Sequence, residues 1–306
     1  MKIIFCGLIL VVMSMIPSIM LGAGITGADI LEVPIGVRPT ALGGAYSALG
    51  DDVYIIDYNP AGLVRIDSPS IGLDNLQSFA GIDTQSISLA IPTETYGTFG
   101  AQIIYRGVPT IENLLATDPA VQAYDSVVII GDGYRLGGID VGVNIKNIFS
   151  ELANEHAFTT AFDFGIALRV LGFRLATSVQ NVGPGVRFEP GPNITDPLPL
   201  TYRLGIGRPL ITNLSSSLLV AVELVQIFDQ GFQESVGIEY WRQRFIALRM
   251  GYRNDPNNLD NGFSLGAAIR HNFGIFECEF GYAWHPASVI QGFTVNSNTF
   301  GILIWL

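Results

Sequence analysis

The sequence predicts an all-β fold: a transmembrane antiparallel β-barrel of about fourteen strands with an N-terminal segment that plugs it. Composition points to a membrane, because 49% of the 306 residues are hydrophobic and only 14% are charged, whereas soluble proteins carry about a quarter of charged residues. Beyond the N-terminus, no apolar run approaches the roughly 18 residues of a membrane-spanning helix. A chain that crosses a membrane without such helices has to cross it as a closed β-barrel.

The first residues have the layout of an export signal. Lys2 precedes an apolar stretch, and residues 22–24 supply the small side chains at which a signal peptidase cuts. We predict a signal peptide over residues 1–23, with an uncleaved anchor helix as the alternative. Because Cys6 would leave with the signal, Cys278 would remain alone, which excludes an internal disulfide and a cysteine-based metal site.

Alternation of apolar with polar or small residues predicts strands through most of the remaining chain. In Ile275–Trp284 the even-numbered residues are apolar, and the odd-numbered ones after Ile275 are charged or small. Successive side chains of a strand point to opposite faces, so one face of this strand is apolar and the other is charged or small. The predicted strands cover residues 70–79, 84–93, 97–107, 125–135, 139–149, 158–169, 174–183, 200–209, 216–227, 234–241, 245–253, 263–271, 275–284 and 298–306.

The connections between these strands favour a membrane barrel over a soluble β-sandwich, whose strands would also alternate. They are tight on one side, as at 94–96 and 272–274, and mostly long on the other, as at 108–124 and 285–297. Short turns at one end and long loops at the other are typical of outer-membrane barrels. The sandwich stays as the alternative, although it needs a polar outer face that these strands lack.

The segment ahead of the first strand is predicted to fold inside the barrel, because wall side chains alone do not fill a barrel this wide. We expect a hatch over residues 24–67 and the barrel over residues 68–306. The predicted inward positions are rich in glycine and serine and carry charges of both signs, which suits a polar inserted segment. The lumen charges that we single out are Asp163, Arg203, Glu239, Arg249, Arg270 and Glu277.

A resemblance to known proteins supports the hatch. Residues Arg38–Leu63, RPTALGGAYSALGDDVYIIDYNPAGL, resemble the N-terminal motif shared by the FadL-type long-chain fatty-acid transporters and the PorV/PorQ family. The segments Val179–Gly185, Leu198–Pro209 and Val236–Arg253 resemble strand motifs of the PorV/PorQ branch. The chain is therefore identified as a member of the PorV/PorQ family within the FadL-type barrels.

The resemblance implies a hatch made of a glycine-rich short helix, an acidic pair and an Asn-Pro-Ala turn. In this chain, the hatch and ligand-gate residues would be Asp51, Asp52, Asn59, Pro60 and Ala61. We expect the inward charges Glu239 and Arg249 to anchor the Asn-Pro-Ala turn.

The same resemblance implies a location in the bacterial outer membrane, surrounded by its lipid, and two functions. The first is association with type IX-like protein secretion, through binding of secreted cargo or of the translocon. The alternative is FadL-like transport of hydrophobic molecules such as long-chain fatty acids. A purely structural role is a third possibility. The apolar residues of 110–121 and 288–295 fit either a ligand mouth or a protein-docking surface.

Other classes of function find no support in the residues. The net charge of −11 excludes nucleic acid as a partner. Asp51, Asp52 and Asp57 match no strong calcium-loop pattern, and we interpret them as a solvated turn. Glu277 and Glu279 share one strand face, and we interpret them as balanced lumen charges rather than a hydrolytic pair. We predict no enzyme, no cofactor and no metal site.

Overall fold

The computed structural model describes residues 26–78, 81–111, 121–191, 193–213, 215–228, 230–255, 261–290 and 293–306. The predicted signal peptide lies outside these ranges. No helix within them is long and apolar enough to cross a membrane.

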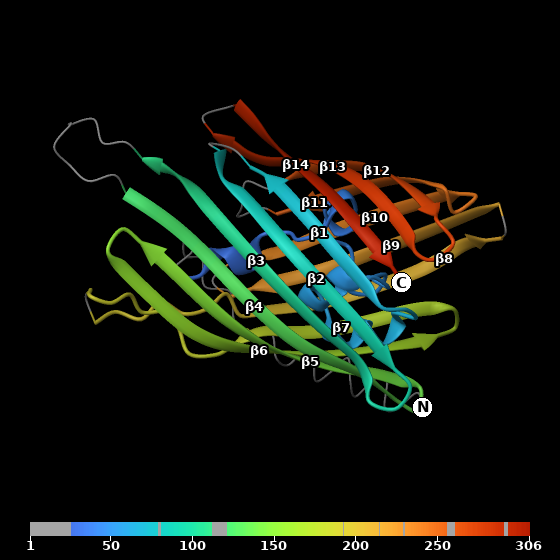
Figure 1. Cartoon of the computed structure of the whole chain (residues 1–306), viewed down its shortest axis with the longest axis horizontal. Coiled ribbons are helices and arrows are strands. Elements are labelled where there is room, and N and C mark those ends of the chain that lie inside the picture. The colour runs from blue at the N-terminus through green and yellow to red at the C-terminus, as the bar shows by residue number, and fades with distance from the viewer. Residues whose placement is uncertain are drawn as a thin grey trace.

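The described residues form one closed antiparallel sheet, which confirms the predicted barrel (Figure 1). Each strand pairs with the next along the chain, and the first pairs with the last to close the ring. At this seam, the Leu306 N–H donates to the Pro69 carbonyl at 2.8 Å. The strands are β1 (Ser70–Gln77), β2 (Asp83–Thr93), β3 (Gly97–Ile111), β4 (Val121–Leu136), β5 (Ile139–Leu152), β6 (Glu155–Val170), β7 (Phe173–Val182), β8 (Thr201–Thr212), β9 (Ser216–Ile227), β10 (Phe232–Arg242), β11 (Ile246–Asn254), β12 (Gly262–Asn272), β13 (Glu277–Ile290) and β14 (Phe293–Trp305).

The outer face of the barrel is apolar and the inner face is mixed, as the alternation predicts. Large apolar side chains such as Ile87, Leu248 and Phe280 are more than half exposed on the outside. Their sequence neighbours point inward and are small or polar. Lipid rather than water is the environment that such an outer face fits.

Two pairs of strands are longer than predicted. The expected loop at 285–297 is mostly strand, because β13 runs to Ile290 and β14 begins at Phe293. The expected loop at 108–124 is shortened in the same way at both ends, and residues 112–120 lie outside the described ranges. A proline within each segment suggests an end to the strand, because proline cannot donate to the ladder. The pairing continues past it through a shift of register, between Pro286 and Ser288 and between Val108 and Ile111.

The chain ahead of β1 lies inside the barrel as four short elements (Figure 1). We call the described residues 26–69 the hatch. Its elements are the 3₁₀ helices η1 (Asp29–Glu32), η2 (Val53–Asp57) and η3 (Pro60–Arg65) and the α-helix α2 (Val37–Ala41). Helix α2 contacts β11–β14, whereas η3 contacts β3–β6. The hatch therefore bridges opposite sides of the wall.

Local sequence explains why these elements begin and end where they do. Gly43 and Gly44 adopt positive φ angles of 64° and 87° directly after α2, a conformation that glycine adopts at no steric cost. Asp52 caps η2 by accepting from the Tyr54 N–H at 3.1 Å. Asn59 caps η3, and Pro60 follows at the first helical position, where its missing N–H costs nothing.

The hatch reaches the wall at glycines. A Cβ placed on Gly142 would lie 2.2 Å from the Pro60 carbonyl carbon, and one on Gly251 would lie 2.1 Å from the Gly43 nitrogen. Both distances are far below any real contact, so a side chain there would displace the hatch backbone. Wall glycines whose Cβ would meet the hatch occur on most strands: Gly72, Gly100, Gly133, Gly142, Gly165, Gly205, Gly207, Gly237, Gly251, Gly266, Gly281 and Gly301. We call them the glycine belt.

The interior of the hatch is apolar, which differs from the polar insert that the sequence predicts. Leu42, Tyr46, Leu49, Ile55 and Leu63 are completely buried and form the centre of the largest apolar cluster in the protein. The hatch packs its own small core in the lumen, and it meets the wall with backbone at some glycines, such as Gly142 and Gly251, and with apolar side chains at others, such as Gly100 and Gly281. Polar wall residues are therefore compatible with an apolar insert.

We predict that Gly142→Val detaches η3 from the wall, since overpacking of this kind costs about 1–3 kcal/mol or more. Hydrogen exchange should show faster exchange of the amides at residues 61–65. Ala267→Val on the outer face of β12 is the matched control and should leave these amides protected. Unchanged exchange in Gly142→Val would contradict the close approach.

Candidate functional site: the hatch and its ion pairs

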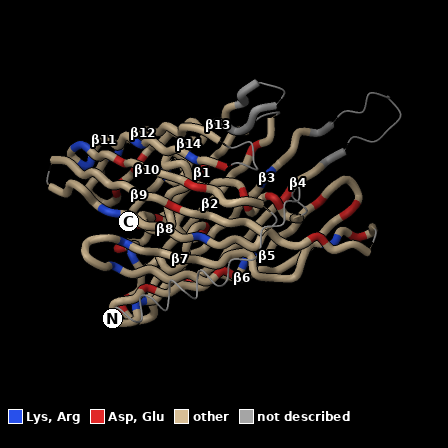
Figure 2. Tube along the Cα trace, turned by 180° about the vertical axis from the view of Figure 1, so that it is seen from behind, with Lys and Arg blue, Asp and Glu red and all other residues tan. Residues whose placement is uncertain are grey.

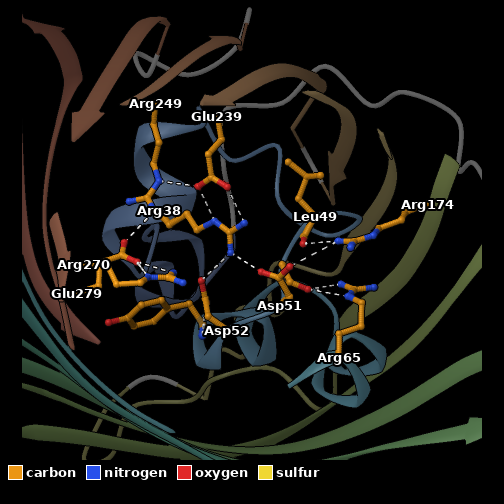
Figure 3. Close-up of polar contacts among 12 residues, drawn as sticks. Arg38, Leu49, Asp51, Asp52, Arg65, Arg174, Glu239, Arg249, Arg270 and Glu279 are labelled. Atoms are coloured by element: carbon orange, nitrogen blue, oxygen red, sulfur yellow. Dashed lines mark hydrogen bonds and ion pairs between the residues drawn. The ribbon is translucent and has the colours of Figure 1, made fainter. Parts of the chain in front are cut away.

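Arg38 of α2 is the centre of the polar contacts between hatch and wall (Figure 3). Its Nε and Nη2 each donate to a different carboxylate oxygen of Glu239 on β10, both at 2.8 Å. Its Nη1 donates to Asp51 at 2.6 Å and to Asp52 at 3.1 Å. One guanidinium thus holds the wall on one side and the acidic pair of the hatch on the other.

The wall continues this pairing as a chain of alternating charges across β10–β13. Glu239 also accepts from Arg249 at 2.7 Å. Arg249 donates in turn to Glu279 at 2.8 Å, and Glu279 accepts from Arg270 at 2.8 Å. The chain ends with Arg270 and Glu277, 3.2 Å apart. We call these five wall residues the ion-pair ladder.

Because the ladder is buried, it determines where the hatch can sit against the wall and does not only add stability. The side chains of Glu239 and Arg249 are completely inaccessible to solvent. A buried pair gains little over an apolar pair, but removal of one partner leaves an uncompensated charge. Arg38 therefore fixes the position of α2 against β10, because in any other position the buried charges of Arg38 and Glu239 would have no partner.

The two carboxyl groups of the acidic pair respond differently to this setting. Burial alone would raise the pKa of Asp51, but Arg38, with help from Arg174 and Arg65, outweighs it and holds the pKa at about 2. Burial raises the pKa of Asp52, and Arg38 offsets only part of this rise. Asp52 is only 2% exposed. Its interpretation as part of a solvated turn is therefore wrong, because Arg38 and the Tyr54 N–H take the place of water.

Two further arginines hold the loop between α2 and η2. The Arg65 Nε donates to the Gly50 carbonyl at 2.8 Å. The Arg174 Nη1 on β7 donates to the Leu49 carbonyl at 3.2 Å and lies 3.7 Å from Asp51. These contacts satisfy carbonyl groups of irregular backbone that would otherwise be buried without partners.

The Asn-Pro-Ala turn is anchored by wall backbone and not by the ladder. The Asn59 Oδ1 accepts from the Ala61 N–H at 3.0 Å, and its Nδ2 donates to the carbonyls of Ile166 and Thr177 at 3.3 Å. The expectation that Glu239 and Arg249 anchor this turn is therefore wrong. They lie on β10 and β11, where Glu239 binds Arg38 and Arg249 binds Glu239, whereas the turn packs on β4–β6.

The remaining predicted lumen charges fix other parts of the interior. Glu223 on β9 accepts from the Tyr46 and Ser47 N–H groups, both at 2.8 Å, and pairs with Arg203 at 3.1 Å. Asp163 is completely buried and lies 3.0 Å from the Lys146 nitrogen. These wall charges thus contact the hatch backbone or each other.

Sequence patterns did not single out Arg38 or Lys146 as site residues, and they predicted Glu223 only as an inward charge. The sequence contains a feature that could have identified Arg38 and Lys146. Arg38 is a lone cation in a stretch of small and apolar residues, thirteen and fourteen residues before the acidic pair. Lys146 is the only lysine beyond Lys2. Glu223 is an ordinary inward acid, and only the fold reveals that it binds the hatch.

A polar cavity of about 780 Å³ lies below the hatch, at the end with the short turns. We call it the vestibule. Hatch residues Arg38, Asp51 and Arg65 form part of its lining, and the turn residues Asn213 and Arg244 surround its opening. Basic residues gather around this end, where the C-terminus also lies (Figure 2).

The arrangement can close the barrel but offers no evident chemistry beyond that. Among the described residues, no group of three or more His, Cys, Asp or Glu side chains could hold a metal ion. The carboxylates of the site are engaged by arginines or by backbone N–H groups. The site is therefore a candidate gate, in which Arg38 joins the hatch to the wall.

Comparisons with known proteins show the fold and little else. No protein-family model matches the chain. A stretch of 140 residues, 44% of the chain, is 21% identical to the UPF0164 protein of Treponema pallidum (strain Nichols) and spans about a third (35%) of that protein's length.

Several solved structures share the architecture over most of the chain. The toluene transporter TodX of Pseudomonas putida matches with a TM-score of 0.61 and 12% identity, over 88% of this chain and 96% of that one. The toluene transporter TbuX of Ralstonia pickettii gives 0.59 and 13%, over 88% and 97%. A FadL homologue of Pseudomonas aeruginosa gives 0.54 and 11%, over 88% and 97%. The fold is therefore that of the FadL-type outer-membrane barrels, and two of these similar structures are named as toluene transporters.

We predict that Arg38→Met loosens α2 and the acidic pair, because breaking a buried ion-pair network costs roughly 3–5 kcal/mol. Hydrogen exchange at residues 37–52 should accelerate by orders of magnitude. Arg187→Met, which removes an exposed ion pair with Glu189 in a surface loop, should change nothing in the hatch. Equal protection in both variants would show that Arg38 does not hold the hatch.

We predict that Asn59→Ala loosens η3, since loss of such a cap costs roughly 0.5–2 kcal/mol. Single-channel recordings in planar bilayers should show more frequent or larger openings. Thr93→Ala is the control, because Thr93 also accepts from a backbone N–H, that of Tyr96 at 3.0 Å, in an exposed turn that does not line the vestibule. Identical conductance in wild type and Asn59→Ala would refute a gating role for the turn.

Proposed function

We propose that the protein transports small or medium-sized hydrophobic molecules across a bacterial outer membrane. The observation that carries this proposal is a wide barrel closed by a hatch that contacts the wall through side chains and close packing but does not take part in the pairing of the strands. A permanent filling would not need a polar vestibule of about 780 Å³ on one side of it. Such a hatch can shift and reseal without breaking the hydrogen bonds of the barrel itself.

The likeness to FadL-type barrels supports transport. Two of the similar structures are named as toluene transporters, and both match about 88% of this chain. The hatch and ligand-gate residues of the proposal are Asp51, Asp52, Asn59, Pro60 and Ala61, with Arg38 as the link to the wall. We propose the division into a signal peptide (1–23), a hatch (24–67) and a barrel (68–306) on the same grounds.

Secretion is the less favoured function. The sequence resemblance to the PorV/PorQ family predicts binding of secreted cargo or of a secretion translocon, but the structural likenesses support the transport branch. A test separates the two. Purification from the native outer membrane in mild detergent, followed by mass spectrometry, should recover the barrel with a hydrophobic small molecule. Recovery with a very large membrane protein or with secreted proteins would favour secretion instead.

A reversible crosslink between hatch and wall tests transport directly. A Cβ placed on Gly207 would lie 3.6 Å from the Ala48 Cβ, within the range of a disulfide. We predict that Ala48→Cys/Gly207→Cys, in a Cys278→Ser background, takes up radiolabelled toluene or oleate at least tenfold more slowly when oxidised. Reduction should restore uptake. The single variant Ala48→Cys is the control and should not respond to redox conditions.

The crosslink experiment can either support or overturn the transport function. Cells of a Gram-negative host without its own hydrophobe channel would express the protein, and uptake would be compared with that of empty cells. No uptake above empty cells for either compound would overturn the proposal. Uptake that persists unchanged with the hatch crosslinked would show that the ligand does not pass this gate.

A further inference from the structure

The two ends of the barrel expose different charges. At the long-loop end, the side chains of Asp29 and Glu189 are exposed, and Arg187, which is also exposed there, is paired with Glu189. Arginines gather at the short-turn end instead (Figure 2). Short turns face the periplasm in bacterial outer-membrane barrels. The basic end therefore faces the inner leaflet of the membrane.

Four exposed arginines form no ion pair with any residue in the described ranges. All four lie at or near the short-turn end: Arg169, Arg208, Arg242 and Arg244. The arginines of the lumen differ from them, because Arg38, Arg203 and Arg249, for example, each bind a carboxylate. The positive charge of the four is therefore left for a partner outside the chain.

Two of these arginines leave the wall on the side that faces lipid. Arg208 on β8 follows Leu204 and Ile206 at every second position, and both of these side chains are exposed on the outer face. Arg242 on β10 follows Ile238 with the same spacing. Because successive side chains of a strand alternate between its faces, both guanidinium groups start from the outer face.

No acidic residue accompanies them on this part of the outer face. From the middle of β6–β11 to the short turns, the other outward positions of the described residues are apolar or neutral. Glu223 and Glu239 lie on β9 and β10 but point into the lumen, where arginines bind them. A cation at the edge of the hydrocarbon is costly unless it reaches water or an anion.

The surroundings of the two arginines fit the polar boundary of a membrane. The Arg208 Cζ lies 4.5 Å from the centroid of the Phe173 ring. Beside Arg242, the hydroxyl oxygens of Tyr240 and Ser216 are 3.3 Å apart. Aromatic side chains and hydroxyl groups are typical of the level at which lipid head groups meet the apolar band.

The turn that carries Arg244 has an unusual sequence for its shape. It joins β10 to β11, and the Phe245 N–H closes it by donating to the Arg242 carbonyl at 2.9 Å. Gln243 and Arg244 have φ angles of 54° and 53°, at positions where asparagine and glycine are usual. In or beside other tight turns of this end, glycine adopts such angles: Gly97, Gly137, Gly172 and Gly274. Arg244 therefore stands where the fold alone favours glycine.

We propose that Arg208, Arg242 and Arg244 form a binding surface for the anionic head groups of phospholipids in the leaflet at the short-turn end. The guanidinium group is always charged, and its fork of N–H donors matches the oxygens of a phosphate. A zwitterionic head group attracts it less, because that head group also carries a cation. The proposal concerns the outer face and the rim, so it does not depend on the transport function.

The outward direction of Arg208 and Arg242 favours a lipid over a soluble anion. Exposed apolar side chains such as Leu210 and Ile206 lie on the same strand as Arg208. An acyl chain can cover these side chains while the phosphate of the same molecule reaches the guanidinium group. A soluble acidic protein would reach Arg244 on the turn more readily than the two arginines on the strands.

Native mass spectrometry of the purified full-length protein in a neutral detergent tests this surface. The probes are phosphatidylglycerol and phosphatidylcholine with the same acyl chains, and wild type should bind the first more tightly by about an order of magnitude. In Arg208→Gln/Arg242→Gln/Arg244→Gln, each lost arginine should weaken phosphatidylglycerol binding about fivefold. Phosphatidylcholine binding should change little. Equal affinity of wild type for both lipids would overturn the proposal.

Two control variants separate charge from packing and from position. Arg208→Lys/Arg242→Lys/Arg244→Lys keeps the three charges and should keep most of the preference for phosphatidylglycerol. Arg187→Gln removes an exposed arginine at the opposite end and should bind both lipids as wild type does. A lysine variant as weak as the glutamine variant, or an equal loss in Arg187→Gln, would contradict the assigned surface.

A soluble competitor distinguishes a lipid from a soluble acidic partner. A poly-aspartate peptide, added at low salt to wild type loaded with phosphatidylglycerol, should leave the lipid bound. Displacement of the lipid by the peptide would show that this surface serves a soluble acidic partner, and the lipid assignment would then be wrong.

Discussion

The structure depends on one constraint: a barrel too wide for its own side chains has to be filled by a segment that fits against its wall. Arg38 shows how that fit is made specific, because it joins the ion-pair ladder of the wall to the acidic pair of the hatch. The glycine belt makes the same fit possible sterically, since backbone can meet backbone only where no Cβ intervenes. The buried charges fix the position of the hatch, and the wall glycines leave the space that this position needs.

The two sides of the lumen hold the hatch through different kinds of interaction. On β10–β13, buried charges hold α2 and the acidic pair in one place. On β3–β6, apolar residues and backbone carbonyls receive η1 and η3. Polar contacts are lost abruptly when geometry changes, whereas apolar contacts tolerate sliding. The hatch is thus held by charge on one side and by apolar and backbone contacts on the other.

The sequence predicts the barrel well, because period-two alternation and loop lengths are local signals that lipid and lumen enforce along every strand. It misjudges β13 and β14, where Pro286 suggests an end but the register shifts and pairing continues. It also takes Asp52 as solvated, because a nearby acidic pair looks like a surface turn until Arg38 folds onto it. The alternation of inward and outward positions along each strand predicts which charges point into the lumen. Their partners, however, depend on which strands face which part of the hatch. No local pattern contains that information.

The path of the hatch through the lumen has a consequence for how the protein is made. Gly27 is bound near the long-loop end, at the connection that contains Pro197, and Pro69 emerges at the opposite end beside the C-terminus. The N-terminal segment is therefore threaded along the barrel axis, and the seam between β1 and β14 is sealed by a continuous ladder around it. A thread of this bulk, with its own packed core, cannot pass a closed seam sideways. Once the ring is closed, the segment can enter the lumen only along the barrel axis.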